Sequence, residues 1–186
     1  MKKEIRIIGI DDCPFDRFKD KEVQIIATLF RGGEWLDGVM STRVEVDGID
    51  ATTKIARMIN KSRFKPQVQA IMLDGIAFGG FNIVDIHELN KKTDIPVIVV
   101  IRKEPDIQRI ENVLARINMH EKIEILRRAG RLHKIGKVYV QFAGTTHKDV
   151  RDLIDVSCTR SHIPEPIRVA HLIGAGLVKG ESRGRA

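Results

Sequence analysis

Residues 67–101 read QVQAIMLDGIAFGGFNIVDIHELNKKTDIPVIVVI, and this stretch decides the class of fold. The apolar run at 68–73 and the unbroken run PVIVVI at 96–101 are typical of strands that are buried on both faces. The segment between them, 82–90, has the pattern of a helix. A strand, a crossover helix and a second strand place the two strands parallel in one sheet, so we predict an α/β fold.

Upstream, the chain has the pattern of an antiparallel meander. Three apolar or alternating runs, at 4–10, 24–30 and 38–46, are separated by polar turns and predict three strands. The last two runs are joined by a short turn that contains glycine, as in a hairpin. A helix over 51–59 then begins near Asp50, a residue type that often caps helix N-termini.

Downstream, the alternation of strands and helices continues. The pattern predicts a helix over 106–118, a strand over 137–142, a helix over 147–158 and a last helix after Pro164. Residues 178–186 have the composition of a flexible basic tail. The sum is a mixed sheet, antiparallel on one side and parallel on the other, with helices on both faces.

The composition describes a basic globular chain. Its 186 residues suit one domain over residues 1–186, and 42% hydrophobic residues exclude a disordered chain. No apolar run reaches the length of a membrane span, and the charged N-terminus and two distant cysteines favour a cytoplasmic location. The 32 basic residues exceed the 25 acidic ones by 7, which favours a polyanionic partner such as a nucleic acid.

Acidic residues collect where the predicted strands end. Asp11 and Asp12 end the first strand, Asp74 ends the fourth, and Asp47 and Asp50 follow the third. If the first and fourth strands are parallel neighbours, Asp11 and Asp74 face each other beyond the carboxyl ends. Carboxylates held this close need a shared proton or cation, and Mg²⁺ or Mn²⁺ prefers such oxygen ligands. With a basic surface, the matching chemistry is metal-assisted hydrolysis of a phosphodiester.

The same residues have structural alternatives. An Asp-Gly pair is a common turn, Asp50 can serve as a helix N-cap, and a pair of acids can simply end a strand. Gly75, Gly79 and Gly80 would let a phosphate or a nucleic-acid strand approach the backbone closely, so they are candidate substrate-binding residues. Their spacing matches neither a P-loop nor a dinucleotide-binding fingerprint.

Four blocks follow one another along the chain: GIDD at 9–12, VDGIDAT at 46–52, LDGIAFGGFN at 73–82 and PVIVVIRK at 96–103. With these blocks the chain resembles the archaeal endonuclease dU family, which is itself similar to endonuclease V within the ribonuclease H-like fold. A further segment, RSHIPEPIRVAH at 160–171, is similar to part of endonuclease V. The resemblance extends over almost the whole chain.

The resemblance implies a metal-dependent endonuclease that hydrolyses a phosphodiester near a deaminated base, deoxyuridine or hypoxanthine. DNA is the implied substrate, with RNA as the alternative. Asp11 and Asp74 match two carboxylates that hold Mg²⁺ or Mn²⁺. The third metal-binding carboxylate of the family falls near Asp50, with Asp47 as the alternative.

Other catalytic positions of the family are matched by different residue types. Arg102, with Lys103 beside it, takes the place of a lysine that would contact the scissile phosphate; arginine stays charged and cannot donate a proton. A catalytic histidine matches Thr145, and His147 is the candidate replacement from two residues further along. The tyrosine segment with which endonuclease V parts strands is replaced by TRVEV at 42–46, so that device is not expected.

Basic residues would supply a salt-dependent grip on phosphates, unless they only form solvated surfaces. The candidates are Lys61, Arg63, Lys65, Arg127, Arg128, Arg131, Lys134, Lys179, Arg183 and Arg185. The isolated His87, His162 and His171 are interpreted as structural, and Cys13 as a packing residue.

Two other functions remain open from the sequence. One is a nucleic-acid-binding protein that keeps the scaffold without turnover, and the other is a regulator that binds a phosphate ligand through residues 75–80. The preferred lesion, the number of metal ions and the choice between monomer and homodimer are not indicated by any motif.

Overall fold

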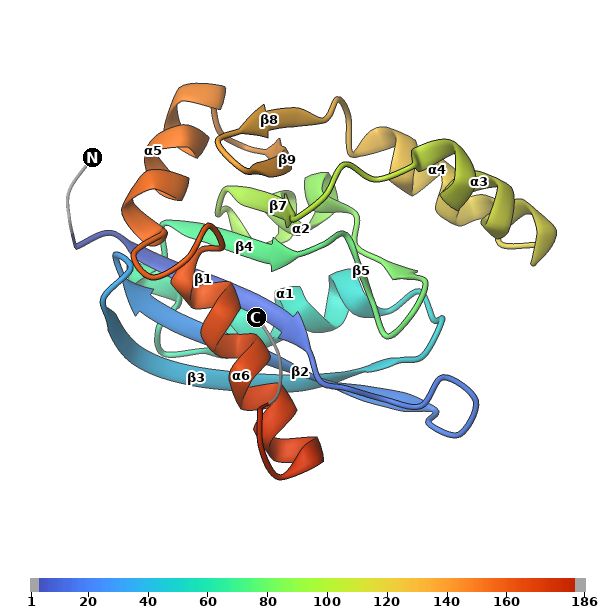
Figure 1. Ribbon diagram of the computed structural model, residues 1–186, viewed down its shortest axis with the longest axis horizontal. Coiled ribbons are helices and arrows are strands. Elements are labelled where there is room, and N and C mark those ends of the chain that lie inside the picture. The colour runs from blue at the N-terminus through green and yellow to red at the C-terminus, as the bar shows by residue number, and fades with distance from the viewer. Residues whose placement is uncertain (1–3, 183–186) are drawn as a thin grey trace.

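The computed structural model describes residues 4–182 and has a seven-stranded mixed sheet flanked by helices (Figure 1). In spatial order the strands are β3 (Trp35–Glu45), β2 (Glu22–Arg31), β1 (Arg6–Asp12), β4 (Ala70–Asp74), β7 (Val97–Ile101), β9 (Val138–Ala143) and β8 (His133–Ile135). A separate ribbon consists of β5 (Ala77–Phe78) and β6 (Asn82–Ile83). The helices are α1 (Ala51–Lys61), α2 (Ile86–Thr93), α3 (Ile107–Arg116), α4 (His120–Arg128), α5 (His147–Ser157) and α6 (Glu165–Lys179), with a 3₁₀ turn at Lys65–Gln67.

β1 joins the antiparallel and parallel parts of the sheet. It pairs antiparallel with β2 and parallel with β4, and β4 pairs parallel with β7. The predicted meander and parallel pair are therefore confirmed. β9 runs antiparallel to β7, however, and β8 pairs antiparallel with β9, so antiparallel pairs lie at both edges rather than at one. A tight turn at Gly136 joins β8 to β9, and so short a connection permits only antiparallel pairing.

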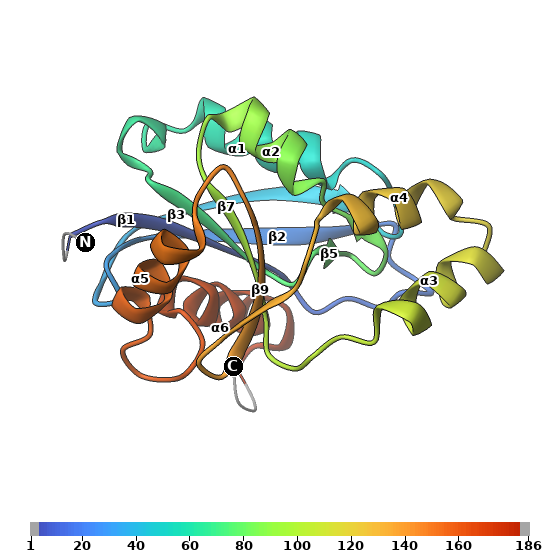
Figure 2. The same cartoon turned by 90° about the horizontal axis from the view of Figure 1, so that it is seen from above.

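Helices cover both faces of the sheet, as predicted. α1 and α2 lie on one face, and α5 and α6 on the other (Figure 2). Alternate strand residues serve the two layers: Ile8 belongs to the core that contains Ile55 of α1, whereas Ile7 packs in the core that contains Leu153 of α5. α3 and α4 stand at one end of the molecule over a small cluster of Ile83, Leu114 and Leu126 (Figure 1).

Several element boundaries differ from the predicted ones. α2 begins at Ile86 rather than at 82, because the Asp85 side chain accepts hydrogen bonds from the N–H groups of His87 and Glu88. The helix predicted over 106–118 ends at Arg116, and α4 follows as a helix that the pattern did not predict.

The C-terminal helix is longer than the sequence pattern indicated. α6 continues to Lys179 and ends at Gly180, whose φ of 79° is the left-handed conformation of a helix cap. The predicted tail therefore begins later than residue 178, and its Arg183 and Arg185 lie outside the described residues. Within 4–182, no helix has the length and apolar character that crossing a membrane requires.

Gly9 lets α6 lie directly on the centre of the sheet. A Cβ atom at Gly9 would collide with the backbone of Pro166 and Ile167 in the first turn of α6. From the neighbouring strand, Thr28 Oγ1 donates a hydrogen bond of 2.7 Å to the Pro166 carbonyl. These contacts fix α6 against β1 and β2, and so determine where His171, a little over one turn further along, is placed.

Candidate metal centre

Two parallel strands end side by side and bring two carboxylates together. Ile10 of β1 pairs with Leu73 of β4, so Asp11 and Asp74 are the next residues on adjacent strands. α6 adds His171 from the face above β1. Each of these three side chains offers one ligand atom, and the three atoms lie within 4.8 Å of one another. The predicted approach of Asp11 to Asp74 is thus confirmed.

Hydrogen bonds and ion pairs orient each member of this cluster. His171 Nδ1 lies 2.8 Å from Asp11 Oδ2, and Arg102 Nη2 lies 2.7 Å from Asp74 Oδ2. The neighbouring Asp12 lines the same pocket without belonging to the cluster, and its Oδ2 accepts a hydrogen bond of 2.7 Å from the N–H of Gly79.

The charges of the cluster are poorly balanced. Burial and the nearby Asp11 raise the pKa of Asp74 to about 6, although Arg102 opposes the shift. Burial likewise raises the pKa of Asp12 to about 6 against the hydrogen bond from Gly79. The hydrogen bond to Asp11 raises the pKa of His171. The site therefore favours bound protons, or a cation in their place.

The donor set fits a hard divalent cation. Ligand atoms that share an octahedral ion at about 2.1 Å lie about 3–4.2 Å apart, so the observed group needs only small side-chain rotations to close on one. Two carboxylates and one imidazole suit Mn²⁺ and are compatible with Mg²⁺. Asp11, Asp74 and His171 are therefore the residues that would hold a metal.

An open pocket of about 530 Å³ gives access to the cluster. Its lining comprises Asp11, Asp12, Cys13, Pro14, Phe15, Asp74, Arg102, His171 and Lys179. Burial and the adjacent Asp12 and Asp11 raise the pKa of the Cys13 thiol to about 11. Cys13 stays protonated near neutral pH and is a packing residue, as predicted, rather than a nucleophile.

Asp50 is engaged by other residues. Its carboxylate accepts hydrogen bonds from Asn82 Nδ2 at 2.6 Å and from the Glu45 N–H at 3.1 Å, and Lys54 Nζ lies 2.9 Å away. Burial alone would raise the pKa of Asp50, but these partners hold it below its usual value. The helix α1 begins directly after Asp50, as predicted, but the Asp50 side chain makes no capping hydrogen bond with it.

Asp47 organises loops instead of facing the pocket. It accepts hydrogen bonds from Arg17 Nε at 2.9 Å and from the Phe81 N–H at 2.7 Å, while its carbonyl accepts one from the buried Lys122 at 2.6 Å. Among the residues that the structure describes, the acidic and histidine group that could hold one ion comprises only Asp11, Asp74 and His171. Asp50 and Asp47, the predicted alternatives for the third carboxylate, are not members of this group.

His147 lies at the opposite end of the parallel strands from the candidate metal cluster. β9 runs antiparallel to β7, with Ala143 opposite Val97, so the chain leaves β9 at the amino ends of the parallel strands. There the His147 ring packs 5.3 Å from that of His133 and 6.4 Å from that of Phe142. The structure does not bring His147 to the carboxylates. The histidine in the cluster is His171, and the signal that could have found it is its place at the end of the PEPIRVAH segment.

The glycines after Asp74 divide into two kinds. Gly75 has a φ of 80° and open space beside it, so a ligand could approach its backbone. Gly79 and Gly80 also have positive φ angles, but side-chain atoms at these positions would meet Val23 and Asp47 respectively. These two glycines shape the loop, and Gly75 remains the candidate for substrate contact.

The predicted basic residues lie at both ends of the parallel strands. Lys179 lines the pocket, Lys103 is exposed next to Arg102, and Lys134 pairs with Tyr139, which is level with the end of β7. Lys61, Arg63 and Lys65 precede β4 and so lie near the amino ends of the parallel strands. Arg127 and Arg128 form ion pairs with Glu111 and Asp85.

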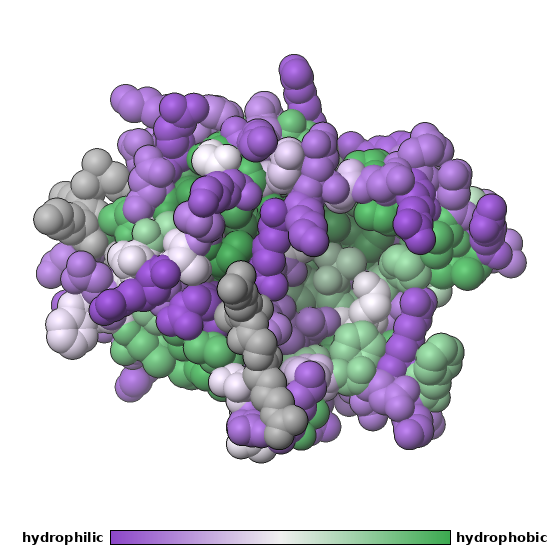
Figure 3. Space-filling view, in the orientation of Figure 1, coloured by the Kyte–Doolittle hydropathy of each residue, from purple (hydrophilic) through white to green (hydrophobic). Residues whose placement is uncertain are grey.

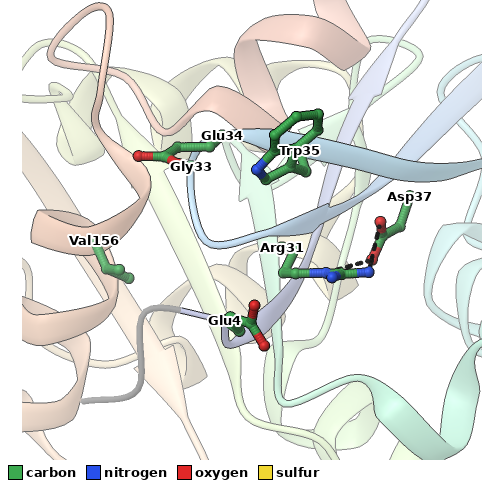
Figure 4. A pocket seen from close by; sticks show the side chains of 7 residues that line it. All are labelled: Glu4, Arg31, Gly33, Glu34, Trp35, Asp37 and Val156. Atoms are coloured by element: carbon green, nitrogen blue, oxygen red, sulfur yellow. Dashed lines mark hydrogen bonds and ion pairs between the residues drawn. The ribbon is translucent and has the colours of Figure 1, made fainter.

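A second pocket, of about 660 Å³, lies at the end of the sheet where β1 begins, away from the candidate metal cluster (Figure 4). It is lined by Glu4, Arg31, Gly33, Glu34, Trp35, Asp37 and Val156. On one side of it, Arg31 Nε donates a hydrogen bond of 3.2 Å to Asp37 Oδ2. Its acids are not part of the candidate metal cluster, so we assign the chemistry to the smaller pocket.

Comparisons with known proteins agree with this geometry. A family model described as endonuclease dU matches residues 3–178. A UPF0215 protein from Methanothermobacter thermautotrophicus is 49% identical over 100% of this chain and 94% of its own length. A solved protein of unknown function from Archaeoglobus fulgidus, 36% identical, covers 93% of this chain and 98% of its own with a TM-score of 0.87.

A more distant match concerns the fold alone. Endonuclease V from Ciona intestinalis, solved in complex with a DNA containing an inosine, is 14% identical with a TM-score of 0.58. The match covers 89% of this chain and 82% of that one. The fold is thus the ribonuclease H-like fold that was predicted. With a family model that spans nearly the whole sequence, this chain belongs to the endonuclease dU family.

Proposed function

We propose that this protein is a divalent-metal-dependent endonuclease that hydrolyses a phosphodiester near a deaminated base. The observation that carries the proposal is the cluster of Asp11, Asp74 and His171 beside Arg102, in an open pocket at the carboxyl ends of parallel strands. Membership of the endonuclease dU family supports a nuclease role.

Each residue of the cluster has a distinct part in this proposal. Asp11, Asp74 and His171 would hold the ion, and Mg²⁺ or Mn²⁺ when bound would supply an activated water and neutralise phosphate charge. Arg102 is 38% exposed at its side chain and can turn from Asp74 toward a phosphate, where its fixed charge stabilises the developing negative charge. Asp12 holds the Gly79 backbone and so shapes the pocket wall.

The proposed substrate is DNA that contains deoxyuridine or hypoxanthine, with RNA as the alternative. The solved endonuclease V from Ciona intestinalis is bound to an inosine-containing DNA, which supports this class of ligand. The open backbone at Gly75 is the position where a base or sugar could pack against the pocket wall. Lys103, Lys134 and Lys179 would contact neighbouring phosphates without reading the base.

The proposal is tested by a cleavage panel with Mg²⁺ and with Mn²⁺. Substrates are single-stranded and duplex oligonucleotides that contain uracil, hypoxanthine or an abasic site, together with RNA counterparts and undamaged controls. We expect wild-type cleavage next to the deaminated base, and at least 100-fold slower cleavage by Asp11→Asn and Asp74→Asn. His171→Ala should lose both activity and Mn²⁺ affinity measured by calorimetry.

Matched controls separate the site from the scaffold. His147→Ala removes a histidine at the amino ends of the parallel strands, and Asp155→Asn removes an exposed carboxylate on α5; both should keep wild-type rates. Salt-sensitive binding to DNA without cleavage of any substrate would instead support a binding protein without turnover. A regulator that binds a small phosphate through residues 75–80 is less well supported, since Gly79 and Gly80 are occupied by internal contacts.

A further inference from the structure

The loop between β1 and β2 reaches from the candidate metal centre into solvent. Phe15 of this loop lines the pocket together with Asp11 and Asp74. The loop lies at the same end of the molecule as α3 and α4 in both ribbon views (Figures 1 and 2). In the space-filling view, a hollowed area with apolar side chains lies between α3–α4 and this loop (Figure 3). The loop therefore borders the path by which a polymer would reach the pocket.

Phe18 sits on this loop and is 96% exposed. A turn that is hydrogen-bonded within itself holds the residue outward: the Asp16 side chain accepts from the Phe18 N–H at 2.9 Å, and the Asp16 carbonyl accepts from the Asp20 N–H at 2.8 Å. The Asp16 N–H in turn donates to Asp20 Oδ2 at 2.8 Å. The backbone that carries the ring is thus held by hydrogen bonds within the turn.

A chain of hydrogen bonds connects this turn to the candidate metal centre. Arg17 Nε donates to Asp47 Oδ2 at 2.9 Å, and the Asp47 N–H donates to the Gly79 carbonyl at 2.8 Å. The Gly79 N–H then donates to Asp12 Oδ2 at 2.7 Å, next to Asp11. The Arg17 guanidinium also lies 4.7 Å from the centre of the Phe81 ring. The position of Phe18 relative to the cluster is therefore held by the same loops that shape the pocket.

The surroundings of Phe18 determine which partner suits it. Single exposed apolar residues are common, and a protein partner needs a larger apolar patch than one ring. Phe18 stands among charged neighbours of both signs instead, with Arg17 and Lys19 directly beside it in sequence. Each of these two cations is paired with an acid, Arg17 with Asp47 at 2.9 Å and Lys19 with Asp16 at 3.3 Å, on exposed side chains that can turn toward a phosphate. An aromatic ring flanked by cations suits a nucleobase, whose flat face stacks on the ring while its phosphates meet the basic side chains.

We propose that Phe18 stacks on a nucleobase of the substrate strand close to the cleaved phosphodiester and positions that strand across the metal centre. The inference rests on the proposed nuclease function. Because every base has a flat face, the contact adds affinity and register without specifying the lesion.

The test uses the fact that Trp35 is the only tryptophan of the chain. Phe18→Trp in a Trp35→Phe background places a single tryptophan on the loop. Oligonucleotides are added with Ca²⁺ in place of Mg²⁺ or Mn²⁺, and tryptophan emission is recorded. We expect strong quenching for the loop tryptophan and none for the wild-type protein. In the wild type, Trp35 lies at the end of the sheet where β1 begins, away from the candidate metal cluster.

Affinity supplies the second measurement. Phe18→Ala should bind single-stranded DNA about ten-fold more weakly, which is about 1.4 kcal/mol. Phe18→Trp should bind as the wild type does, and the matched exposed-aromatic control Trp35→Ala should be unchanged. In cleavage assays, Phe18→Ala should raise KM more than it lowers kcat.

The outcomes separate this inference from the function on which it rests. Cleavage and binding by the wild type, with equal affinity for Phe18→Ala and no quenching of the loop tryptophan, would overturn the role of Phe18 and leave the nuclease intact. Absence of both binding and cleavage by the wild type would overturn the proposed function, and this inference with it.

Discussion

Asp74 lies between opposing charges, and the balance between them makes it sensitive to a bound cation. Asp11 and burial disfavour its ionised form, while Arg102 at 2.7 Å favours it. His171 contacts Asp11 and could bind a cation only after its ring nitrogen has released its proton. Proton binding and metal binding at this site therefore compete.

This competition predicts how stability depends on pH without metal. The pKa of Asp74 and of Asp12 is about 6 in the folded protein against an ordinary value of 3.8, so the folded state binds protons more strongly between these values. The raised pKa of His171 adds stability that is complete below its ordinary value and is lost at higher pH. The free energy of unfolding in EDTA should fall by about 1–3 kcal/mol from pH 4.5 to pH 8.

Urea unfolding at several pH values measures this fall. Mn²⁺ should raise the stability more at pH 8 than at pH 5, because protons then compete less for the ligands. Asp74→Asn removes one of the titrating groups and should flatten the pH profile. A stability in EDTA that rises steadily from pH 5 to pH 8 would contradict the electrostatic account of the cluster.

At the scale of elements, the site depends on how closely α6 approaches β1. Gly9 is the position where the helix backbone lies on the strand, and Thr28 adds a hydrogen bond to Pro166. Since His171 is on the same helix, the packing that stabilises the fold also positions a residue of the candidate metal cluster. α4 is attached to the rest of the protein through Lys122, whose buried ammonium donates to the Asp47 carbonyl.

Gly9→Ala should destabilise the protein by about 1–3 kcal/mol, because the added methyl group collides with backbone atoms that cannot rotate away. It should also weaken Mn²⁺ binding, since α6 and His171 would shift. Gly176→Ala on α6 is the control: it has open space and should stabilise the helix by about 0.5–1 kcal/mol. Thermal unfolding and calorimetry measure both effects, and equal behaviour of the two variants would refute the close packing.

Lys122→Met should destabilise the attachment of α4 by about 1–3 kcal/mol, because the Asp47 carbonyl would lose its donor in a buried position. The effect should be local. Hydrogen exchange should show faster opening in α3 and α4 and little change in β1 and β4. Unchanged protection of α3 and α4 would show that the apolar cluster of Leu114 and Leu126 is sufficient to hold them.

For the whole molecule, a surplus of 7 positive charges coexists with a local group of two acids at the candidate metal centre. The two ends of the parallel strands differ. The carboxyl ends carry the acidic cluster, Arg102 and Lys179, and the amino ends carry the Trp35 pocket and His147. A polyanion should therefore bind asymmetrically, over the carboxyl ends of β1, β4 and β7.

The affinity for nucleic acid should fall steeply with salt. If four phosphates are contacted, the dissociation constant should rise about 100-fold between 50 and 200 mM salt. Lys134→Ala with Lys179→Ala should weaken binding and reduce the salt dependence. Lys61→Ala with Arg63→Ala, near the amino ends of the parallel strands, is the matched pair and should have little effect. Fluorescence anisotropy measures all three proteins, and equal losses in both double variants would contradict an asymmetric binding surface.

The sequence by itself determined most of the elements and two of the three members of the candidate metal cluster, because these depend on local patterns. Strand periodicity and the crossover unit around 67–101 predicted the parallel pair, and parallel neighbours bring Asp11 and Asp74 together whatever else the chain does. The capping residue Asp85, which sets the start of α2 at Ile86, was a weaker signal, since short polar side chains serve turns and caps alike.

Only the tertiary structure decided the rest of the site. His171 lies 160 positions from Asp11 in sequence, and their contact depends on α6 packing over Gly9, which no local pattern encodes. Asp50 and Asp47 were predicted as alternatives for a third carboxylate, and in the structure Lys54, Asn82 and Arg17 bind their side chains. His147 was excluded by the direction of β9. Long-range packing and strand direction are properties of the whole fold, and for that reason they assigned the third member of the cluster.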